Sequence, residues 1–346
     1  MFNLRYRVNR HCQGPSFYRR VDDMPIPDAI YKATVALSRE RIAVGRLDAP
    51  THADITAAVA TGSHGTASSS VAPKHLDSVA ASIFRQQYEL AAREGLSFHR
   101  ASAQRARYAR EYKTGSSIVE IASRARCPPY LMARLLLEEL CDVRGDDVRL
   151  LLRNPDLVPD ARLRSDVVNA VEVDQFFGPA VDRARAAIGA AHEELLWAAL
   201  RRRDLPFISE EGMRELGAPK TPDVRLDVPI GLIDATGTAR VVHWIDSKAT
   251  FGDPDSHAAN LRQLQGYANR EGPGLVIYWF DYVESLHATT QPDVAILDHL
   301  PALFALPGGV RADVAGAGPR VSRGEPVRAM SVDDIIERVG KRGGTW

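Results

Sequence analysis

The order of hydrophobic patterns in the second half of the chain constrains its fold more than any other feature. A helical pattern over 180–204 is followed by two strand-like runs, 224–234 and 241–249, which flank a turn with the sequence Ala-Thr-Gly-Thr. A helical pattern over 257–269 comes next, and the apolar run 274–281 is typical of a buried strand. Helix, hairpin, helix and strand in this order predict a three-layer α/β domain.

A helical region precedes this predicted domain. From His75 onward, apolar residues recur at helical spacing. Ser117 and Glu120 form an S-x-x-E capping box, and a second helix is expected to begin near Pro129. Two short helices across a tight connection, residues 117–141, have the layout of a helix-turn-helix, whereas a helical hairpin in an ordinary bundle is the alternative.

The charge of the chain is divided unevenly. Residues 1–130 carry 19 basic and 11 acidic side chains, and residues 131–346 carry 25 and 33. This asymmetry suggests a polyanion-binding part joined to a part that concentrates carboxylates, with compositional drift as the alternative. The side chains predicted to contact nucleic acid, mainly its phosphate backbone, are Arg105, Arg107, Arg110, Arg126, Tyr130 and Arg134.

Charged side chains converge on the predicted hairpin. Asp223 enters its first strand, and Asp246 and Lys248 lie two residues apart on its second strand, hence on one face. Two hard oxygen ligands suit Mg²⁺ or Mn²⁺, with water and a substrate phosphate completing the coordination. The Lys248 amine could orient and deprotonate an attacking water and offset charge on the phosphate. These residues predict metal-dependent hydrolysis of phosphodiesters.

Four further positions extend the predicted site. Glu193, on the preceding helix, is a candidate metal ligand or water-orienting group, and the main-chain carbonyl of Ser247 is a candidate ligand. Gln263 and Tyr267 lie four residues apart on one face of the helix after the hairpin, where they could contact a phosphate or an ordered water.

Each of these positions also has a structural alternative. Asp246 and Lys248 could form a surface ion pair, Asp223 could be a turn residue after a proline, and Glu193 could lie on a solvated helix face. Taken singly, each alternative is the commoner situation, because short charged motifs arise by chance. The order of the four elements, helix Glu, strand Asp, strand Asp-x-Lys and helix Gln-x-x-x-Tyr, is what favours the catalytic interpretation.

The same order of elements resembles the PD-(D/E)xK nuclease superfamily, particularly its Holliday-junction-resolvase-like branch. The sequences KTPD at 220–223, HWIDSKATFGD at 243–253 and GPGLVIYW at 272–279 resemble the TPD-motif proteins, the codanin-interacting nuclease family. The segments PYLMARLLLEEL, LLRNPDLVPD and AIGAAHEELL also match that family's pattern. The likeness covers about residues 75–285 and leaves out both ends of the chain.

The resemblance implies a restriction-endonuclease-like core behind an N-terminal all-α domain with a helix-turn-helix. It implies magnesium-type chemistry at Glu193, Asp223, Asp246 and Lys248, with Gln263 and Tyr267 as accessory positions, and a codanin-type partner where the host has one. One departure is that Asp246 stands where family members carry glutamate before Ser-Lys. Aspartate is one methylene shorter, so the metal would sit nearer the strand or accept a bridging water, and the rate of turnover stays open.

The leading hypothesis is therefore a magnesium-dependent deoxyribonuclease that cuts DNA phosphodiesters, with selectivity for branched or flapped DNA expected by analogy. One alternative is a catalytically weak or inactive adaptor with a nuclease fold, which binds nucleic acid and a protein partner. The other is a helix-turn-helix transcription factor with an unrelated C-terminal domain. The sequence leaves open DNA against RNA, endonuclease against exonuclease, and monomer against homodimer.

The chain divides into four predicted segments. These are a partly disordered extension over 1–73, a helical domain over 74–172, a nuclease domain over 173–300 and a tail over 301–346. No apolar run approaches 18 residues, so no membrane span is expected, and three scattered cysteines indicate a reducing compartment. The expected location is the nucleus or the cytoplasm, while the Arg-rich N-terminus leaves organelle targeting open.

Overall fold

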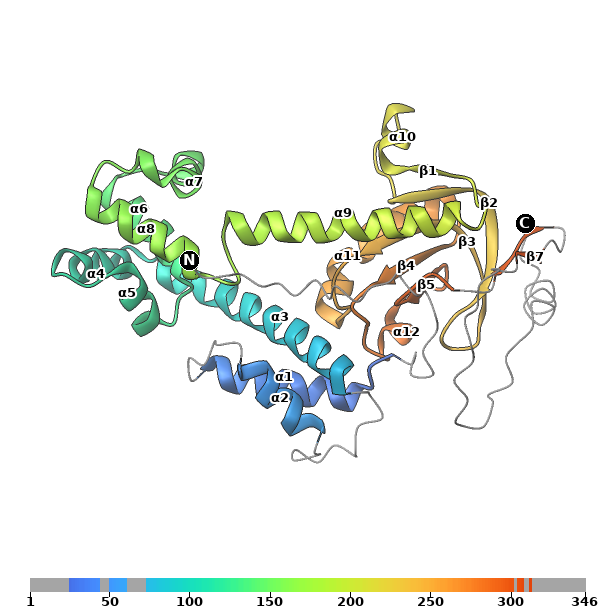
Figure 1. The fold of residues 1–346 in the computed structure, drawn as a ribbon, viewed down its shortest axis with the longest axis horizontal. Helices are drawn as coiled ribbons and strands as arrows, with labels where there is room; N and C mark the ends of the chain where they lie inside the picture. Colours follow the sequence, from blue (N-terminus) through green and yellow to red (C-terminus); the bar gives the residue numbers. More distant parts are fainter. Residues whose placement is uncertain (1–24, 44–49, 61–72, 302–303, 308–310, 313–346) are drawn as a thin grey trace. The chain divides into compact units, whose positions relative to one another are not determined.

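The computed structural model describes residues 25–43, 50–60, 73–301, 304–307 and 311–312 (Figure 1). Predictions for the rest of the N-terminal extension and of the tail lie outside the described residues. The described residues form two compact units that divide between Ile188 and Gly189, within one long helix. We call one the α/β unit, which contains the described residues 25–28 and those from Gly189 onward. We call the other the helical unit, which contains the described residues from Ala29 to Ile188.

A mixed sheet forms the centre of the α/β unit. Among the described residues it has seven strands in the order β5-β4-β3-β2-β6-β7, with β1 paired to β2. The strands are β1 (Phe207–Ser209), β2 (Val224–Ile233), β3 (Ala239–Lys248), β4 (Gly274–Tyr278), β5 (Val294–Leu297), β6 (Phe304–Ala305) and β7 (Arg311–Ala312). β2 and β3 form an antiparallel hairpin, whereas β3, β4 and β5 run parallel. The predicted hairpin and the predicted buried strand are both confirmed.

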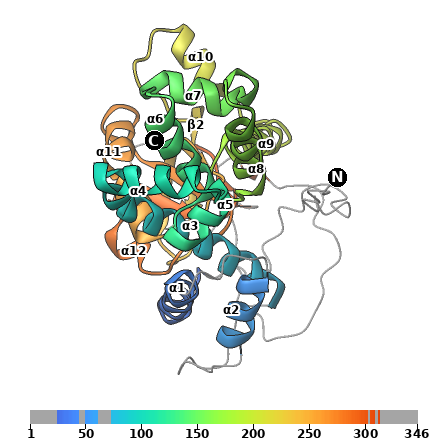
Figure 2. The ribbon, with the colours of Figure 1, turned by 90° about the vertical axis from the view of Figure 1, so that its left-hand side faces the viewer.

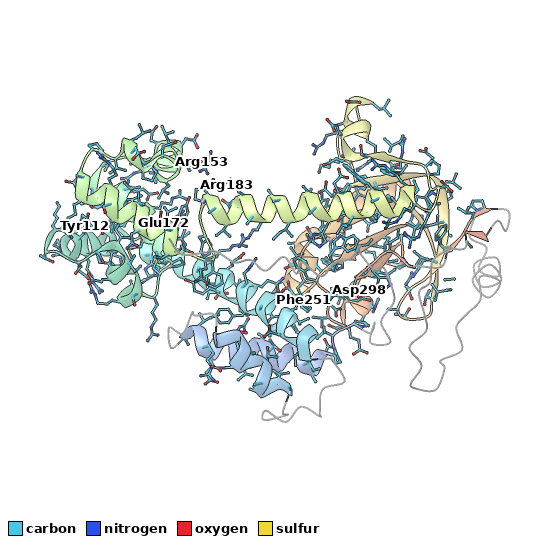
Figure 3. All side chains as sticks on the ribbon, viewed as in Figure 1. Tyr112, Arg153, Glu172, Arg183, Phe251 and Asp298 are labelled. Atoms are coloured by element: carbon cyan, nitrogen blue, oxygen red, sulfur yellow. The ribbon has the colours of Figure 1, made fainter. Side chains whose placement is uncertain are left out.

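Helices cover both faces of this sheet (Figures 1 and 3). On one face of the sheet, Leu196 and Leu200 from the second half of α9 (Pro179–Arg201) form a hydrophobic core with strand residues such as Ile277 of β4. On the other face, α11 (Pro254–Glu271) and α12 (Leu286–Thr289) cover Trp244 and Val276. All five residues of β4 are buried, because a parallel strand covered on both faces needs apolar side chains on both. The unit is thus a mixed α/β structure, as predicted.

The helical unit contains eight described helices and the beginning of α9. They are α1 (Asp28–Ala43), α2 (Pro50–Ala60), α3 (Pro73–Arg100), α4 (Ser102–Lys113), α5 (Ile118–Ala125), α6 (Pro129–Leu140), α7 (Gly145–Arg153) and α8 (Ala161–Val173). A short 3₁₀ helix, η1 (Pro155–Leu157), follows α7. α4, α5 and α8 pack around α6, and α2 packs against α3 (Figure 2). The core of the α4–α8 part is formed by residues such as Ile121, Leu136 and Val167.

The helices α1 and α2 of this unit were not predicted from the sequence. α1 escapes the hydrophobic pattern because its buried face carries Thr34 and Ser38, whose hydroxyls donate to the carbonyls of Ile30 and Thr34. The Arg-rich stretch 98–112 is not one helix, since α3 ends at Arg100 and α4 begins at Ser102.

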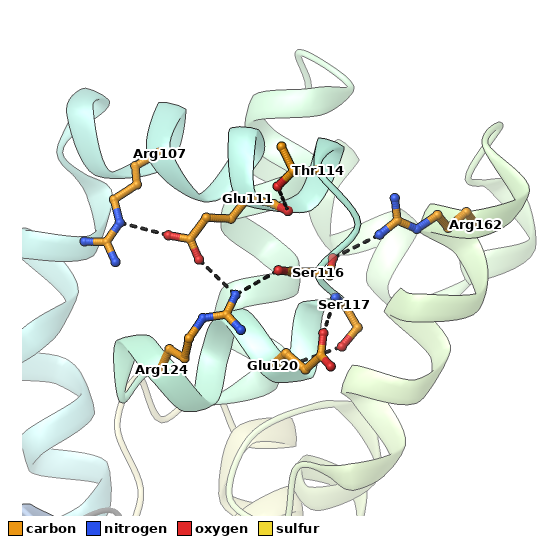
Figure 4. Close-up of polar contacts among 8 residues, drawn as sticks. All are labelled: Arg107, Glu111, Thr114, Ser116, Ser117, Glu120, Arg124 and Arg162. Atoms are coloured by element: carbon orange, nitrogen blue, oxygen red, sulfur yellow. Dashed lines mark hydrogen bonds and ion pairs between the residues drawn. The ribbon is translucent and has the colours of Figure 1, made fainter.

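The segment 117–141 forms the two predicted helices. Ser117 Oγ accepts a hydrogen bond from the Glu120 N–H at 3.3 Å, and Glu120 Oε2 accepts one from the Ser117 N–H at 2.8 Å, which confirms the capping box (Figure 4). α5 ends at Ala125, the C-cap residue Arg126 turns the chain with a φ of 53°, and α6 begins at Pro129. Within the described residues, no helix combines the length and the apolar character needed to cross a membrane.

Candidate functional site

The start of β2 and the end of β3 bring two aspartates and a lysine together. The hairpin pairs Val224 with Ile245, so the residues beside them, Asp223 and Asp246, become neighbours. Asp223 Oδ2 accepts a hydrogen bond of 2.6 Å from the Ser247 N–H. Lys248 lies two residues after Asp246 on β3 and therefore on the same face of the strand. Its Nζ is 2.7 Å from Asp246 Oδ2. We call Asp223, Asp246 and Lys248 the acid–lysine cluster.

The acid–lysine cluster concentrates charge in a desolvated place. Asp246 is only 1% exposed. Burial, followed by the charge of the nearby Asp246, raises the pKa of Asp223 to about 7, although the Ser247 N–H and the Lys248 charge oppose the rise. Burial alone would lower the pKa of Lys248, but the charge and hydrogen bond of Asp246, together with the charges of Asp223 and Glu210, outweigh it and raise that pKa. Lys248 is therefore a cation at neutral pH, in a cluster whose Asp223 carboxyl group is partly protonated.

Glu193 and Tyr267 approach the cluster from two helices. Glu193 is partly buried on α9, and its pKa is raised first by burial, then by the charges of Glu210 and Asp246. Tyr267, 2% exposed on α11, has its pKa raised by burial and then by Asp246. Gln263 Nε2 donates a hydrogen bond of 2.6 Å to Tyr267 Oη. The structure thus gathers around one cluster the side chains predicted from the hairpin and from its two flanking helices.

Glu210 is a fourth carboxylate near the cluster that the sequence analysis missed. It is the first residue of α10 (Glu210–Glu215) and donates its N–H to the Asp223 carbonyl at 3.0 Å. Its Oε1 accepts hydrogen bonds from Arg214 at 2.6 Å and from Thr221 Oγ1 at 3.3 Å. Glu210 is also the largest charge contribution to the raised pKa of Glu193. Its only signal in the sequence is its position after a short strand-like run, which does not distinguish it from Glu211.

Replacement of Glu210 by glutamine is expected to lower the pKa of Glu193 toward its usual range. Glutamine keeps the shape of the side chain and can still bond to Thr221, but it removes the negative charge that disfavours ionisation of Glu193. A carboxyl-carbon NMR titration of Glu193 would measure the change. Glu215→Gln, an exposed substitution on the same helix, is the matched control. An identical Glu193 titration in Glu210→Gln and wild type would contradict this account of the site.

The buried Asp246 and the partly buried Asp223 offer two carboxylates that suit a hard divalent cation. Asp246 Oδ2 is buried, and among the described residues it has the Lys248 ion pair but no partner with hydrogen-bond geometry. Across the part of the chain that the structure describes, no three His, Cys, Asp or Glu side chains are grouped closely enough to hold a metal ion by themselves. Mg²⁺ commonly takes only one or two carboxylates and completes its shell with water and phosphate. Asp223 and Asp246 therefore fit such an ion. Glu193 does not complete a group of three ligands with them.

Acidic partners hold several of the basic residues predicted to contact nucleic acid. Arg107 lies 2.9 Å from Glu111, as Figure 4 shows, and Arg134 lies 3.1 Å from Glu138. Arg105 lies 3.7 Å from Glu139 and 4.0 Å from Glu138. Ion pairs of this kind contribute about 0–1 kcal/mol when exposed, so a phosphate could compete for the arginines. Contact with nucleic acid stays a prediction.

The beginning of α6 offers less to a phosphate than the helix-turn-helix interpretation expects. The Asp174 carboxylate accepts a hydrogen bond of 2.9 Å from the Tyr130 N–H in the first turn of α6. The Tyr130 ring is partly buried beside Gly178. Arg110 and Arg126 are exposed. The helix terminus is thus already neutralised by a carboxylate of the same unit, and the two exposed arginines are the more accessible candidates.

Fold and site together define a mixed α/β protein with an acid–lysine cluster where the start of β2 lies beside the end of β3. A family model described as a protein of unknown function with the TPD sequence motif matches residues 159–300, which include Thr221, Pro222 and Asp223. The chain belongs to this family, as the resemblance predicted, and curated relatives share most of its length.

These relatives carry the name CDAN1-interacting nuclease 1. The protein from Danio rerio is 36% identical over 234 residues, which cover 64% of this chain and 76% of the relative. The protein from Xenopus laevis is 36% identical over 254 residues, 69% of this chain and 82% of the relative. The protein from Homo sapiens is 33% identical over 238 residues, 65% of this chain and 83% of the relative. No solved structure matches the chain significantly.

Proposed function

We propose that this chain is a divalent-cation-dependent nuclease of the PD-(D/E)xK type that hydrolyses DNA phosphodiesters. The observation that carries the proposal is the acid–lysine cluster, in which residues far apart in the sequence meet at one desolvated place. The order α9, β1, β2, β3, α11, β4 agrees with a restriction-endonuclease-like core. The name of the relatives, which includes the word nuclease, supports the same activity.

The aspartates and the lysine have separate roles in this proposal. Asp223 and Asp246 would hold Mg²⁺ or Mn²⁺, and the bound ion would offset negative charge on the attacked phosphate. Lys248 adds a second positive charge, since its raised pKa keeps the amine protonated at neutral pH. This favours orientation of the attacking water and stabilisation of the transition state over a role as the general base.

Glu193 and the pair Gln263–Tyr267 complete the proposed site. Glu193 lies close enough to Asp246 and Lys248 to respond to their charges, so it could orient the attacking water from α9. Gln263 holds the Tyr267 hydroxyl by a hydrogen bond, which fixes a polar group on the α11 side. Asp246 stands where the resemblance implies a glutamate, so its shorter side chain would place the ion nearer β3 or leave room for a bridging water.

A catalytically weak adaptor is the second candidate function. The relatives' name describes an interaction with CDAN1, and a codanin-type partner for this chain is therefore part of the proposal. Asp246 also stands where the resemblance implies a glutamate. An adaptor would keep the fold and its partner surface without turnover. Either function fits a protein of the nucleus or the cytoplasm.

A cleavage panel separates the two functions. Linear, flapped and branched DNA, and an RNA of the same sequence, are incubated with the full chain and Mg²⁺, Mn²⁺ or EDTA. A nuclease is expected to cut at least one DNA with either ion, and to lose all activity in EDTA. Binding of DNA without cleavage under every ion condition would overturn the nuclease proposal and favour the adaptor.

A further inference from the structure

A second site lies in the α/β unit, separate from the acid–lysine cluster. It is a cavity of about 460 Å³ where the end of α9 meets β1, within the range of roughly 300–1,000 Å³ typical of small-molecule sites. The lining residues that matter here are Trp197, Arg201, Phe207, Ser209, Glu211 and Asp227. We call this cavity the Trp197 pocket.

One side of the Trp197 pocket is aromatic and cationic. The Trp197 and Phe207 rings are stacked at 30°, with their centroids 6.4 Å apart. The Arg201 guanidinium lies 6.0 Å from the Trp197 centroid and 5.8 Å from the Phe207 centroid. Both rings are partly buried and pack against the sheet core, which fixes them in place. Flat aromatic surfaces with an arginine beside them are the usual platform for stacking a nucleobase.

The other side of the pocket presents hydrogen-bond acceptors. Glu211 and Asp227 are exposed acids, and ionised carboxylates only accept hydrogen bonds. Two negative charges disfavour a bare phosphate, whereas the amino edges of guanine, adenine and cytosine can donate to them. The Trp197 Nε1–H is buried and has no acceptor among the described residues. This set of groups suits a flat, hydrogen-bond-donating heterocycle.

The pocket is next to the acid–lysine cluster along the chain. Ser209 and Glu211 line the pocket, while Glu210 between them bonds to Thr221 and Asp223. We propose that the Trp197 pocket binds an unpaired nucleobase of the nucleic-acid strand that the acid–lysine cluster cuts. Only the identity of that strand rests on the proposed function, since the groups that would recognise a base belong to the pocket itself. An unpaired base held in the pocket would give selectivity for flaps, branches or single strands.

Ligand binding in the absence of metal tests the proposal directly. The full chain in EDTA is titrated with guanosine 5′-monophosphate, uridine 5′-monophosphate or ribose 5-phosphate, followed by saturation-transfer NMR and by tryptophan fluorescence. Guanine offers N1–H and N2–H₂ to a carboxylate, whereas uracil offers a single N3–H. We expect guanosine 5′-monophosphate to bind about tenfold more tightly than uridine 5′-monophosphate, and ribose 5-phosphate to give no transfer to the pocket.

Exposed acids provide variants that keep the fold. Asp227→Asn and Glu211→Gln are each expected to weaken binding of guanosine 5′-monophosphate about tenfold, because an amide in place of a carboxylate loses the charge-assisted bond. Glu215→Gln, an exposed acid outside the pocket lining, is the matched control and should bind as wild type does. Trp197→Ala should abolish binding, with its circular dichroism spectrum as the check on folding.

The outcomes for the pocket and for the nuclease are distinguishable. Equal binding of guanosine 5′-monophosphate and ribose 5-phosphate, or unchanged binding in both Asp227→Asn and Glu211→Gln, overturns the nucleobase proposal even if the chain cuts DNA. Base-dependent binding that the two variants weaken supports it even if no DNA is cut. In that case the nuclease proposal fails alone, and the pocket belongs to a nucleotide-binding adaptor.

Discussion

Replacement of Lys248 by methionine is expected to slow DNA cleavage by about 10²–10³-fold, the cost of removing one charge-stabilising donor from a preorganised site. Methionine has a similar length, so it can fill the same space. It removes the cation that lies 2.7 Å from Asp246 Oδ2. The measurement is the initial cleavage rate on whichever DNA the wild-type chain cuts, with saturating Mg²⁺ or Mn²⁺.

Lys220→Met is the matched control for this substitution. Lys220 is exposed and comes just before the Thr-Pro-Asp motif, and its carbonyl, not its amine, accepts a hydrogen bond from Arg270. The control should therefore cut DNA within about twofold of wild type, because a surface lysine away from the reacting atoms contributes little. Equal rates for Lys248→Met and Lys220→Met would remove the acid–lysine cluster from the catalytic account. Thermal melting of both variants shows whether the fold is kept.

The acid–lysine cluster could be predicted from the sequence because its geometry follows from local rules. Alternation along one strand places Asp246 and Lys248 on the same face, and a hairpin with a short turn brings the start of its first strand beside the end of its second. Glu210 follows no such rule. It reaches the cluster through contacts with Thr221, 11 residues away, and with Asp223, and these depend on how α10 packs.

The order of the strands and the ion pairs of the arginines also separate into features that local sequence predicts and features that only tertiary packing decides. β5 is a run of four apolar residues whose parallel pairing with β4 joins distant segments, so no local pattern indicates it. The Arg134–Glu138 pair has the i,i+4 spacing of a helix ion pair and could have been inferred from the sequence. The Arg105–Glu139 pair joins α4 to α6 and could not. A count of basic residues therefore overestimates how many arginines are free of a protein partner and available to a phosphate.

Substitution of Gly274 by alanine is expected to destabilise the α/β unit by about 3 kcal/mol, at the upper end of the cost of overpacking a core. A Cβ at Gly274 would lie 2.0 Å from the Trp244 ring, a distance that no rotamer adjustment of alanine can relieve. The ring has little freedom to move, since Trp244 is fully buried and its Nε1–H donates to the Gly272 carbonyl at 2.7 Å. Chemical denaturation gives the free energy of unfolding of each variant.

Gly266→Ala is the control that separates crowding from a general effect of removing glycine. Gly266 lies within α11, where an added Cβ would come no closer than 3.5 Å to the flexible end of Arg270. Alanine there should leave stability unchanged or raise it by up to about 1 kcal/mol, because glycine is a poor helix former. If Gly274→Ala unfolds at the same denaturant concentration as Gly266→Ala, Trp244 does not pack against the start of β4. The face of β3 that also carries Asp246 and Lys248 would then lack the rigid support on which the geometry of the cluster depends.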